Sequence, residues 1–215
     1  DLTQSLAQRY TVLEPIGSGS GGQVFLAEQL HPVCRKVAIK LLRSGLEGPA
    51  FLVAFQRERQ ILATMNHPNI ASILDAGTTR AGRPYLVMEF VEGTGITRYC
   101  DSRKLDLRQR LELFLQICQA VQHAHQKGII HRDIKPSNII VTHANSQALP
   151  KLIDFGIASA GEEPEGVSQV AGTPSYMSPE QAGLGGDDAD TRADLFGLGV
   201  VLYELLAGSP PWAPH

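Results

Sequence analysis

Several features are scarce in this sequence, and each scarcity excludes a class of protein. Only three cysteines occur in 215 residues, and the wide, irregular spacing of Cys34, Cys100 and Cys118 fits neither a disulfide framework nor a zinc site. Lys and Arg number 19 against 22 Asp and Glu, so no broad basic field attracts nucleic acid or an anionic membrane. These features predict a cytoplasmic protein without a nucleic-acid partner.

Long apolar runs are also missing. The most apolar late stretch, 195–207, is far shorter than a membrane span and contains Glu204, which favours a buried helix. No signal peptide opens the chain, so no membrane contact is expected within this segment, and an anchor outside it is left open.

The first part of the chain has the pattern of a small antiparallel sheet. Five β-rich runs, separated by glycine-bearing turns, predict strands at 10–16, 23–28, 36–42, 73–79 and 85–89. Between the third and fourth runs, apolar residues at helical spacing predict one helix over 50–65. This part should form a sheet with one helix packed on it.

The pattern changes after Glu92-Gly93-Thr94-Gly95. A helix is predicted from apolar residues at three- and four-residue intervals, namely Leu107, Leu111, Phe114, Cys118 and Val121. A second helix is predicted over 190–206. The sequence therefore predicts an α+β protein, with a sheet lobe at 1–92 and a mainly helical lobe at 93–215.

A glycine triplet lies between the first two predicted strands. Gly17, Gly19 and Gly22 form G-x-G-x-x-G, with Val24 following. A dinucleotide-binding fold would place the last glycine at a helix start, whereas a glycine loop between strands can approach nucleotide phosphates with its amides. Taken alone, the triplet is equally typical of a flexible hairpin turn. The loop also contains Ser18, Ser20 and Gly21.

A lone lysine ends the apolar run Val37-Ala38-Ile39-Lys40. An unpaired buried ammonium is costly, so Lys40 must reach solvent or meet an anion. Glu58 on the predicted helix offers that anion. Taken alone, Glu58 fits a solvated surface glutamate better, because arginines flank it on both sides.

Residues 131–138, His-Arg-Asp-Ile-Lys-Pro-Ser-Asn, place a carboxylate, two cations and a carboxamide between two apolar runs. A charged surface loop would rarely be enclosed in this way. Asp133 can accept the proton of a hydroxyl nucleophile, Lys135 can neutralise a phosphoryl group, and an Asn138 oxygen can bind magnesium. Asp154, sixteen residues after Asn138 in Asp-Phe-Gly, offers a second oxygen ligand for a cation that bridges nucleotide phosphates.

These motifs, in this order from Ile16 to Pro211, resemble the eukaryotic-type protein kinase family and, closely, its bacterial serine/threonine members. The resemblance implies a two-lobed kinase fold that uses ATP and Mg²⁺. It implies that Asp133 is the catalytic base, that Lys135 steadies the γ-phosphate, and that Asn138 and Asp154 hold magnesium. The glycine loop would cover ATP, Lys40 would contact its phosphates, and Glu58 would pair with Lys40.

The same resemblance implies the remaining nucleotide contacts. The adenine would lie between apolar side chains, and Glu89 and Val91 would present backbone hydrogen bonds. The implied ATP-binding residues are Ile16, Gly17, Ser18, Gly19, Ser20, Gly21, Gly22, Val24, Ala38, Lys40, Met88, Glu89, Val91 and Ile140.

The acceptor class follows from Lys135 and from the segment 172–180, which resemble the serine/threonine branch. In that branch Thr173 would bond toward Asp133 and Lys135 and help to form a shallow site for a short hydroxyl side chain. The predicted function is transfer of the ATP γ-phosphate to Ser or Thr of protein substrates. A pseudokinase or scaffold, and a small-molecule kinase of the same fold, are the alternatives, and the oligomeric state is left open.

Arg132 suggests a basic pocket for a phosphate on the activation loop. The family position for that phosphate is Gln169 here, and Ser168 is its neighbour. Weak autophosphorylation at Ser168 and activity independent of phosphate are equal alternatives.

The end of the chain departs from the family pattern. Asp194 resembles the aspartate that starts the central helix and anchors the catalytic loop. The resemblance implies further helices beyond residue 215, one of which carries the arginine partner of Glu180. We therefore expect a C-terminally truncated domain that lacks its last helices, with Glu180 buried and unpaired, and with marginal stability.

Overall fold

The computed structural model describes residues 2, 6, 8–19, 21–45, 48–155, 174–182 and 190–212, except the side chains at 49, 50, 54, 58 and 174. The described residues fall into two compact units. The first contains the residues up to Met65 together with Ser72–Phe90, and the second contains Asn66–Ala71 and the described residues from Val91 onward. The short segment 66–71 thus joins the second unit, although the chain on both sides of it belongs to the first.

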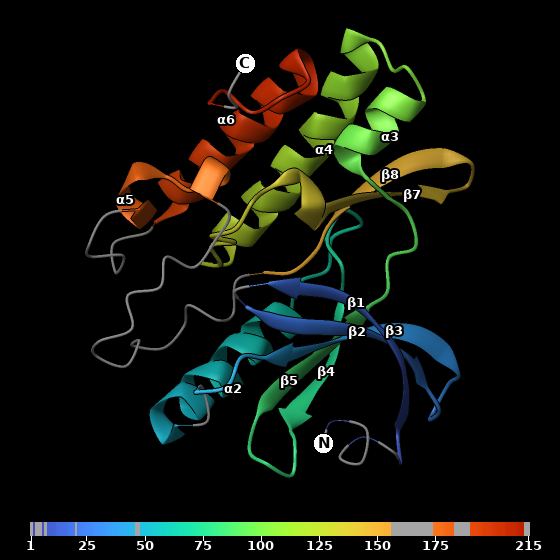
Figure 1. Ribbon diagram of the computed structural model, residues 1–215, viewed down its shortest axis with the longest axis vertical. Coiled ribbons are helices and arrows are strands. Elements are labelled where there is room, and N and C mark those ends of the chain that lie inside the picture. Colours follow the sequence, from blue (N-terminus) through green and yellow to red (C-terminus); the bar gives the residue numbers. More distant parts are fainter. Residues whose placement is uncertain are drawn as a thin grey trace. The chain divides into compact units, whose positions relative to one another are not determined.

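The first unit is built on a five-stranded sheet. Its strands are β1 (Tyr10–Gly19), β2 (Gly22–Gln29), β3 (Arg35–Leu42), β4 (Ile73–Thr78) and β5 (Pro84–Glu89). They lie in the order β1-β2-β3-β5-β4, and each neighbouring pair is antiparallel (Figure 1). The predicted antiparallel sheet is therefore confirmed.

The helix α2 (Pro49–Ala63) accompanies this sheet (Figure 1). Proline is favoured in a first helical turn because the amide it lacks would have no helical partner there. Phe55 and Leu62 are buried, and the Arg59 Nη1 atom donates to the Ala76 carbonyl of β4 at 3.1 Å. The predicted helix on the sheet is confirmed, and it ends two residues earlier than expected.

The first unit also has a buried core cluster, which consists of Leu6, Tyr10, Ala27, Val37, Ile39, Leu41, Tyr85 and Val87. Tyr10 is 2% exposed, and its hydroxyl donates to Asp75 Oδ2 at 2.9 Å. Arg9 forms an ion pair with the same oxygen at 2.8 Å. A buried phenol is thus held next to a carboxylate, which favours its neutral form.

This tyrosine makes the stability of the fold sensitive to alkaline pH. Burial, and then the hydrogen bond to Asp75, raises the pKa of Tyr10 from 10.0 to about 12. Its contribution to stability is complete below pH 10 and is lost as the pH rises toward 12, because the unfolded phenol ionises first. We expect wild type to lose about 1–3 kcal/mol of unfolding free energy relative to Tyr10→Phe between pH 9 and pH 12. Urea unfolding at each pH measures this difference, and parallel curves for the two proteins would contradict it.

The described residues of the second unit form four α-helices: α3 (Ile96–Ser102), α4 (Leu107–Gln126), α5 (Pro179–Ala182) and α6 (Thr191–Ala207). A capping box starts α4, because Asp106 Oδ1 accepts from the Gln109 amide and Gln109 Oε1 accepts from the Asp106 amide. Asp190 caps α6, which ends at Gly208 with a φ of 85°. The predicted mainly helical part is confirmed.

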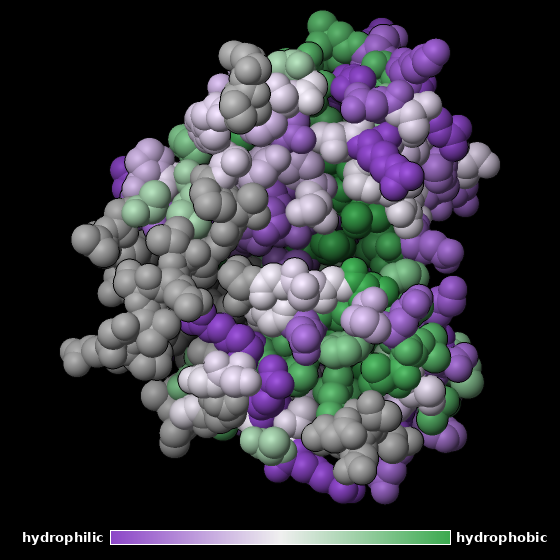
Figure 2. Space-filling model, in the orientation of Figure 1, coloured by the Kyte–Doolittle hydropathy of each residue, from purple (hydrophilic) through white to green (hydrophobic). Residues whose placement is uncertain are grey.

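The buried face of α4 includes the predicted Phe114 and Val121, and it departs from the expected face at the start of the helix. Leu107 is 61% exposed, and the buried side chains are Leu113, Phe114, Ile117, Ala120, Val121 and Ala124. Leu107 opens the helix, and the buried stripe runs along the turns that follow it. Apolar side chains therefore also reach the surface, and Figure 2 shows green residues among the purple ones on the face that it draws.

A small sheet in the second unit was not predicted. It consists of β6 (Thr94–Gly95), β7 (Ile139–Ala144) and β8 (Gln147–Leu152), and the short 3₁₀ helix η1 (Pro136–Asn138) leads into β7. Asn145 and Ser146 connect β7 to β8 with φ angles of 50° and 67°, as a two-residue hairpin turn requires. The Ile139-Ile140-Val141 run was the signal in the sequence.

The segment 66–71 is bound to β8. Ile70 pairs with Leu152 in parallel, the Leu152 amide donates to the Asn69 carbonyl at 2.8 Å, and the Ala71 amide donates to the Leu152 carbonyl at 3.0 Å. The Asn69 Nδ2 atom donates to the Pro150 carbonyl at 2.7 Å. These bonds explain why the segment belongs to the second unit.

Candidate active site

The glycine loop is the tip of the β1–β2 hairpin. Gly17 lies opposite Val24, and Gly19 lies opposite Gly22, so the strands run closer to the turn than the sequence predicted. Gly22 has a φ of 131°, and a Cβ atom there would lie 2.1 Å from the Leu41 carbonyl oxygen of β3. Only glycine fits this position, which keeps the turn close to the neighbouring strand. Ser20 lies outside the described residues.

Lys40 of β3 is 5% exposed and lies next to this hairpin. It is in register with Val24 of β2, and its Nζ atom lies 2.9 Å from where a Cβ atom of residue 21 would be. The absence of a side chain at Gly21 therefore gives the ammonium room at the hairpin tip. The side chain of Glu58 lies outside the described residues, so its pairing with Lys40 stays a prediction.

The predicted adenine residues divide between the two units. In the sheet, Ala38 of β3 lies opposite Met88 of β5, and both are 6% exposed. Ile16 of β1 is 44% exposed, and the Glu89 amide donates to the Ser72 carbonyl at 2.9 Å. Two of the predicted contacts, Val91 and Ile140, belong to the second unit, and their role in nucleotide binding stays a prediction.

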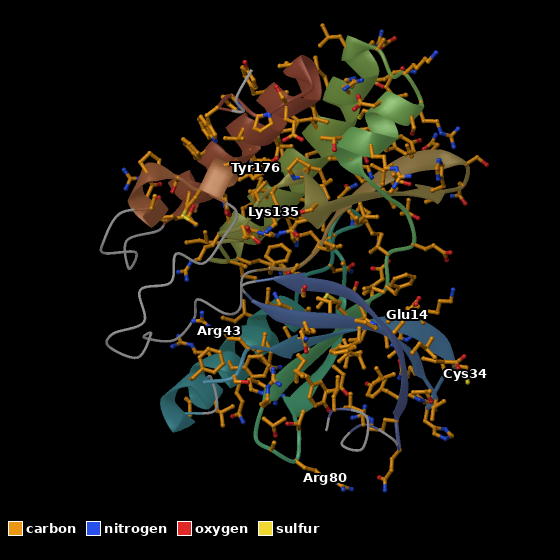
Figure 3. All side chains as sticks on the ribbon, viewed as in Figure 1. Glu14, Cys34, Arg43, Arg80, Lys135 and Tyr176 are labelled. Atoms are coloured by element: carbon orange, nitrogen blue, oxygen red, sulfur yellow. The ribbon has the colours of Figure 1, made fainter. Side chains whose placement is uncertain are left out.

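In the second unit, two predicted catalytic residues, Asp133 and Lys135, form one cluster with the predicted magnesium ligand Asn138. Asp133 Oδ2 accepts from the Lys135 Nζ atom at 2.7 Å and from the Asn138 Nδ2 atom at 3.1 Å. Asn138 Nδ2 also donates to the Asp133 carbonyl at 2.8 Å (Figure 3 labels Lys135). Both side-chain bonds use Oδ2, so within the described part of the chain Oδ1 is the oxygen left to accept from a ligand. The Asn138 amide oxygen is left in the same way.

Asp194 anchors the loop that carries these residues. It is 1% exposed, its Oδ2 accepts from the His131 amide at 2.8 Å, and its Oδ1 accepts from the Arg132 amide at 2.7 Å. His125 of α4 donates from Nε2 to the same Oδ2 at 2.7 Å. The buried carboxylate is thus hydrogen-bonded on both oxygens, which offsets the cost of burying it.

Asp154 follows β8, and its neighbour Ile153 is hydrogen-bonded to Asn138. The Ile153 amide donates to the Asn138 carbonyl at 2.9 Å, and the His131 Nε2 atom donates to the Ile153 carbonyl at 3.1 Å. Asp154 itself has a φ of 64°, in the left-handed region that non-glycine residues rarely adopt. The Phe155 ring packs on the His131 ring with centroids 4.6 Å apart, so the position of Asp154 is fixed on both sides.

Comparison with known proteins identifies this arrangement. The family model described as the protein kinase domain matches residues 10–215. The chain belongs to this family. The kinase domain of PknI from Mycobacterium tuberculosis, solved by crystallography, is 30% identical with a TM-score of 0.71, over 96% of this chain and 78% of that one. The predicted family and kinase fold are confirmed.

Two further bacterial relatives are more similar in sequence to this kinase domain than PknI is. The serine/threonine-protein kinase PknB of Mycobacterium leprae is 40% identical over 96% of this chain, and the serine/threonine-protein kinase Pkn2 of Myxococcus xanthus is 39% identical over 95%. The chain spans 34% and 25% of the length of these two relatives. In the part of the chain that the structure describes, no helix has the length and apolar character to cross a bilayer.

The kinase domain has a second cluster around residues 174–182, which we call the acceptor segment. The 3₁₀ helix η3 (Pro174–Tyr176) is held by two side chains: Tyr176 donates to Glu204 Oε2 of α6 at 2.5 Å, and Trp212 Nε1 donates to the Ser175 carbonyl at 2.9 Å. Burial, and then the bond to Glu204, raises the pKa of Tyr176 above its usual range. Both contacts hold residues of the segment for which a substrate-binding role is predicted.

Two expectations about the late part of the domain have different outcomes. Glu180 is exposed in α5, so the predicted cost of an unpaired buried carboxylate was wrong. Burial of Glu180 was expected from the arginine pairing that the kinase resemblance implies, whereas this side chain is exposed to solvent. Thr173, Ser168 and Gln169 lie outside the described residues, and the roles predicted at these positions stay predictions.

Two residues of the site escaped sequence analysis. His125 of α4 donates to Asp194, and Gln181 donates to the Arg132 carbonyl in the catalytic loop, residues 131–138. Neither has a motif that could have revealed it, because the contact that links it to the site is with a residue far away in the chain.

Proposed function

We propose that this kinase domain transfers the γ-phosphate of ATP to Ser and Thr hydroxyls of proteins. The observation that carries the proposal is the Asp133 cluster, in which Lys135 and Asn138 bind one carboxylate oxygen and, among the described residues, leave the other for a hydroxyl. The names of the bacterial relatives, which are serine/threonine-protein kinases, support the same acceptor class.

In this reaction Asp133 orients the acceptor hydroxyl and takes its proton. The hydroxyl oxygen forms a bond with the γ-phosphorus, the bond between that phosphorus and the β,γ-bridging oxygen breaks, and ADP leaves with that electron pair. Lys135 lies within 2.7 Å of Asp133 and offsets negative charge on the transferred group. The protein thus contributes alignment and charge more than covalent chemistry.

The residues present fit a magnesium-bound nucleotide. Asn138 and Asp154 offer two oxygen ligands, and the structure, in its described part, has no group of three or more His, Cys, Asp or Glu that could hold a metal. Mg²⁺ is typically held by one or two carboxylates together with substrate phosphates, so two protein ligands suffice. When bound, Mg²⁺ would neutralise phosphate charge. Lys40 and the hairpin of Gly17, Gly19 and Gly22 are the phosphate contacts that the kinase resemblance implies.

We further propose that the acceptors are proteins and that the domain works in the cytoplasm. The ordered acceptor segment supports a protein substrate, since Ser175 and Tyr176 are fixed by Trp212 and Glu204. Cys34 is exposed in the turn between β2 and β3 (Figure 3), and all three cysteines are free thiols. Free thiols, one of them exposed, favour a reducing compartment.

A transfer assay with radiolabelled ATP and Mg²⁺ tests the proposal. We expect label in casein or histone, recovered mainly as phosphoserine and phosphothreonine, and we expect none in aminoglycosides or choline. Label mainly in phosphotyrosine would contradict the acceptor class. Transfer to small molecules alone would favour a small-molecule kinase, and nucleotide binding without transfer would favour a pseudokinase.

A further inference from the structure

Both peptide groups that flank the Arg132 α-carbon are held by side chains. The Arg132 amide donates to Asp194 Oδ1 at 2.7 Å, and the Arg132 carbonyl accepts from Gln181 Nε2 at 2.8 Å. Arg132 has a φ of 64°, a conformation that is costly for a residue with a side chain. Such a conformation persists when the surroundings impose it, and the bonds from Asp194 and Gln181 do so from either side.

The carbonyl that Gln181 binds belongs to the same peptide group as the Asp133 amide. That amide donates to the His131 Nδ1 atom at 3.3 Å, so the peptide group is bound at both its oxygen and its nitrogen. Because a peptide group is planar, two such bonds fix its orientation. The Asp133 side chain starts from this group, so Gln181 sets its direction without touching a substrate.

The other end of the Gln181 amide holds the acceptor segment. Its Oε1 atom accepts from the Ser178 amide and from the Ser178 hydroxyl, both at 3.1 Å, and Ser178 is 0% exposed. The bridge needs an acceptor toward Ser178 and a donor toward Arg132. A glutamine side chain supplies both, whereas an ionised glutamate supplies acceptors alone.

We propose that Gln181 is a positioning residue for phosphoryl transfer, which ties the acceptor segment at Ser178 to the peptide group before Asp133. The inference rests on the proposed function, because it takes Asp133 as the group that receives the hydroxyl proton. Gln181 makes no bond to the nucleotide residues described above, so its loss should lower kcat and leave the KM for ATP unchanged.

The test is Gln181→Glu in the whole chain, assayed with Mg²⁺, ATP and casein. At pH 8 the carboxylate faces the Arg132 carbonyl without a proton, so we expect kcat to fall about tenfold and the KM for ATP to stay within about twofold of wild type. At lower pH a protonated carboxyl regains a donor, and bonding to the carbonyl favours that form. The ratio of variant to wild-type kcat should therefore rise as the pH falls from 8 to 6.

Two further variants separate positioning from a general structural role. Gln181→Met has a similar length and no donor, so its kcat should be low at every pH. Gln119→Glu changes an exposed glutamine of α4 and should match wild type throughout. Thermal melts check folding, and Gln181→Met carries the kcat test if the glutamate variant does not fold.

The outcomes are distinct. Wild-type kcat in either folded Gln181 variant would overturn the inference alone, and so would an equal loss in both variants at every pH. Absence of transfer by the wild type would overturn the proposed function and this inference with it.

Discussion

Replacing Asp133 by asparagine is expected to lower kcat for protein phosphorylation about 10²–10⁴-fold. The Oδ2 atom is occupied by Lys135 and Asn138, so the amide oxygen of the variant would stay with these donors and its NH₂ group would face the acceptor hydroxyl. An amide nitrogen cannot accept the hydroxyl proton. The substitution keeps size and shape, which confines the loss to chemistry.

Initial rates at saturating Mg²⁺ and ATP measure this effect. Asp101→Asn, at a surface position of α3 with a side chain 62% exposed, is the matched control and should retain wild-type kcat. A thermal melt of Asp133→Asn should lie close to that of wild type. Retention of near wild-type kcat in the folded Asp133→Asn protein would remove Asp133 from the mechanism.

The second large effect is expected at Asp194, where an asparagine should cost about 3 kcal/mol or more of unfolding free energy. The carboxylate accepts on both oxygens, from His131 and His125 on Oδ2 and from Arg132 on Oδ1. An amide has a single oxygen, so its NH₂ group must face a buried backbone N–H. Two opposed donors in a buried site are costly, and the catalytic loop should also lose its geometry and its activity.

Asp190→Asn provides the control on the same helix. Asp190 caps α6 and accepts from the Arg192 amide, and asparagine is about as good a cap as aspartate. We expect the urea unfolding curve of this variant to lie close to that of wild type. Equal unfolding free energies for Asp190→Asn and Asp194→Asn would show that the buried bonds of Asp194 contribute little.

Most of the fold could be predicted from local sequence patterns. The five strands of the first unit and the helices α2, α4 and α6 follow from periodicity, whereas the caps Asp106 and Gly208 were recognised only in the structure. The cluster of Asp133, Lys135 and Asn138 was also predictable, because its members lie within six residues of one another. A site formed by one short segment can be predicted from the sequence, because the chain itself keeps its functional groups close together.

Long-range contacts could not be predicted in the same way. The bonds from His125 to Asp194 and from Gln181 to Arg132 join residues 69 and 49 positions apart. No local sequence pattern predicts contacts at such separations. The exposure of Leu107 and Glu180 likewise depends on what each helix packs against. Such features are set by tertiary packing, which overrides local propensity.

The segment 66–71 limits how this protein can be cut. A fragment that begins at Val91 would retain the catalytic loop and β8, yet it would lose the chain that pairs Ile70 with Leu152 and that gives Asn69 to Pro150. The Leu152 amide would then lack its partner. Adding a short peptide that covers 66–71 to such a fragment would therefore measure how much the stability of the second unit depends on this segment, which the chain supplies between two stretches of the first unit.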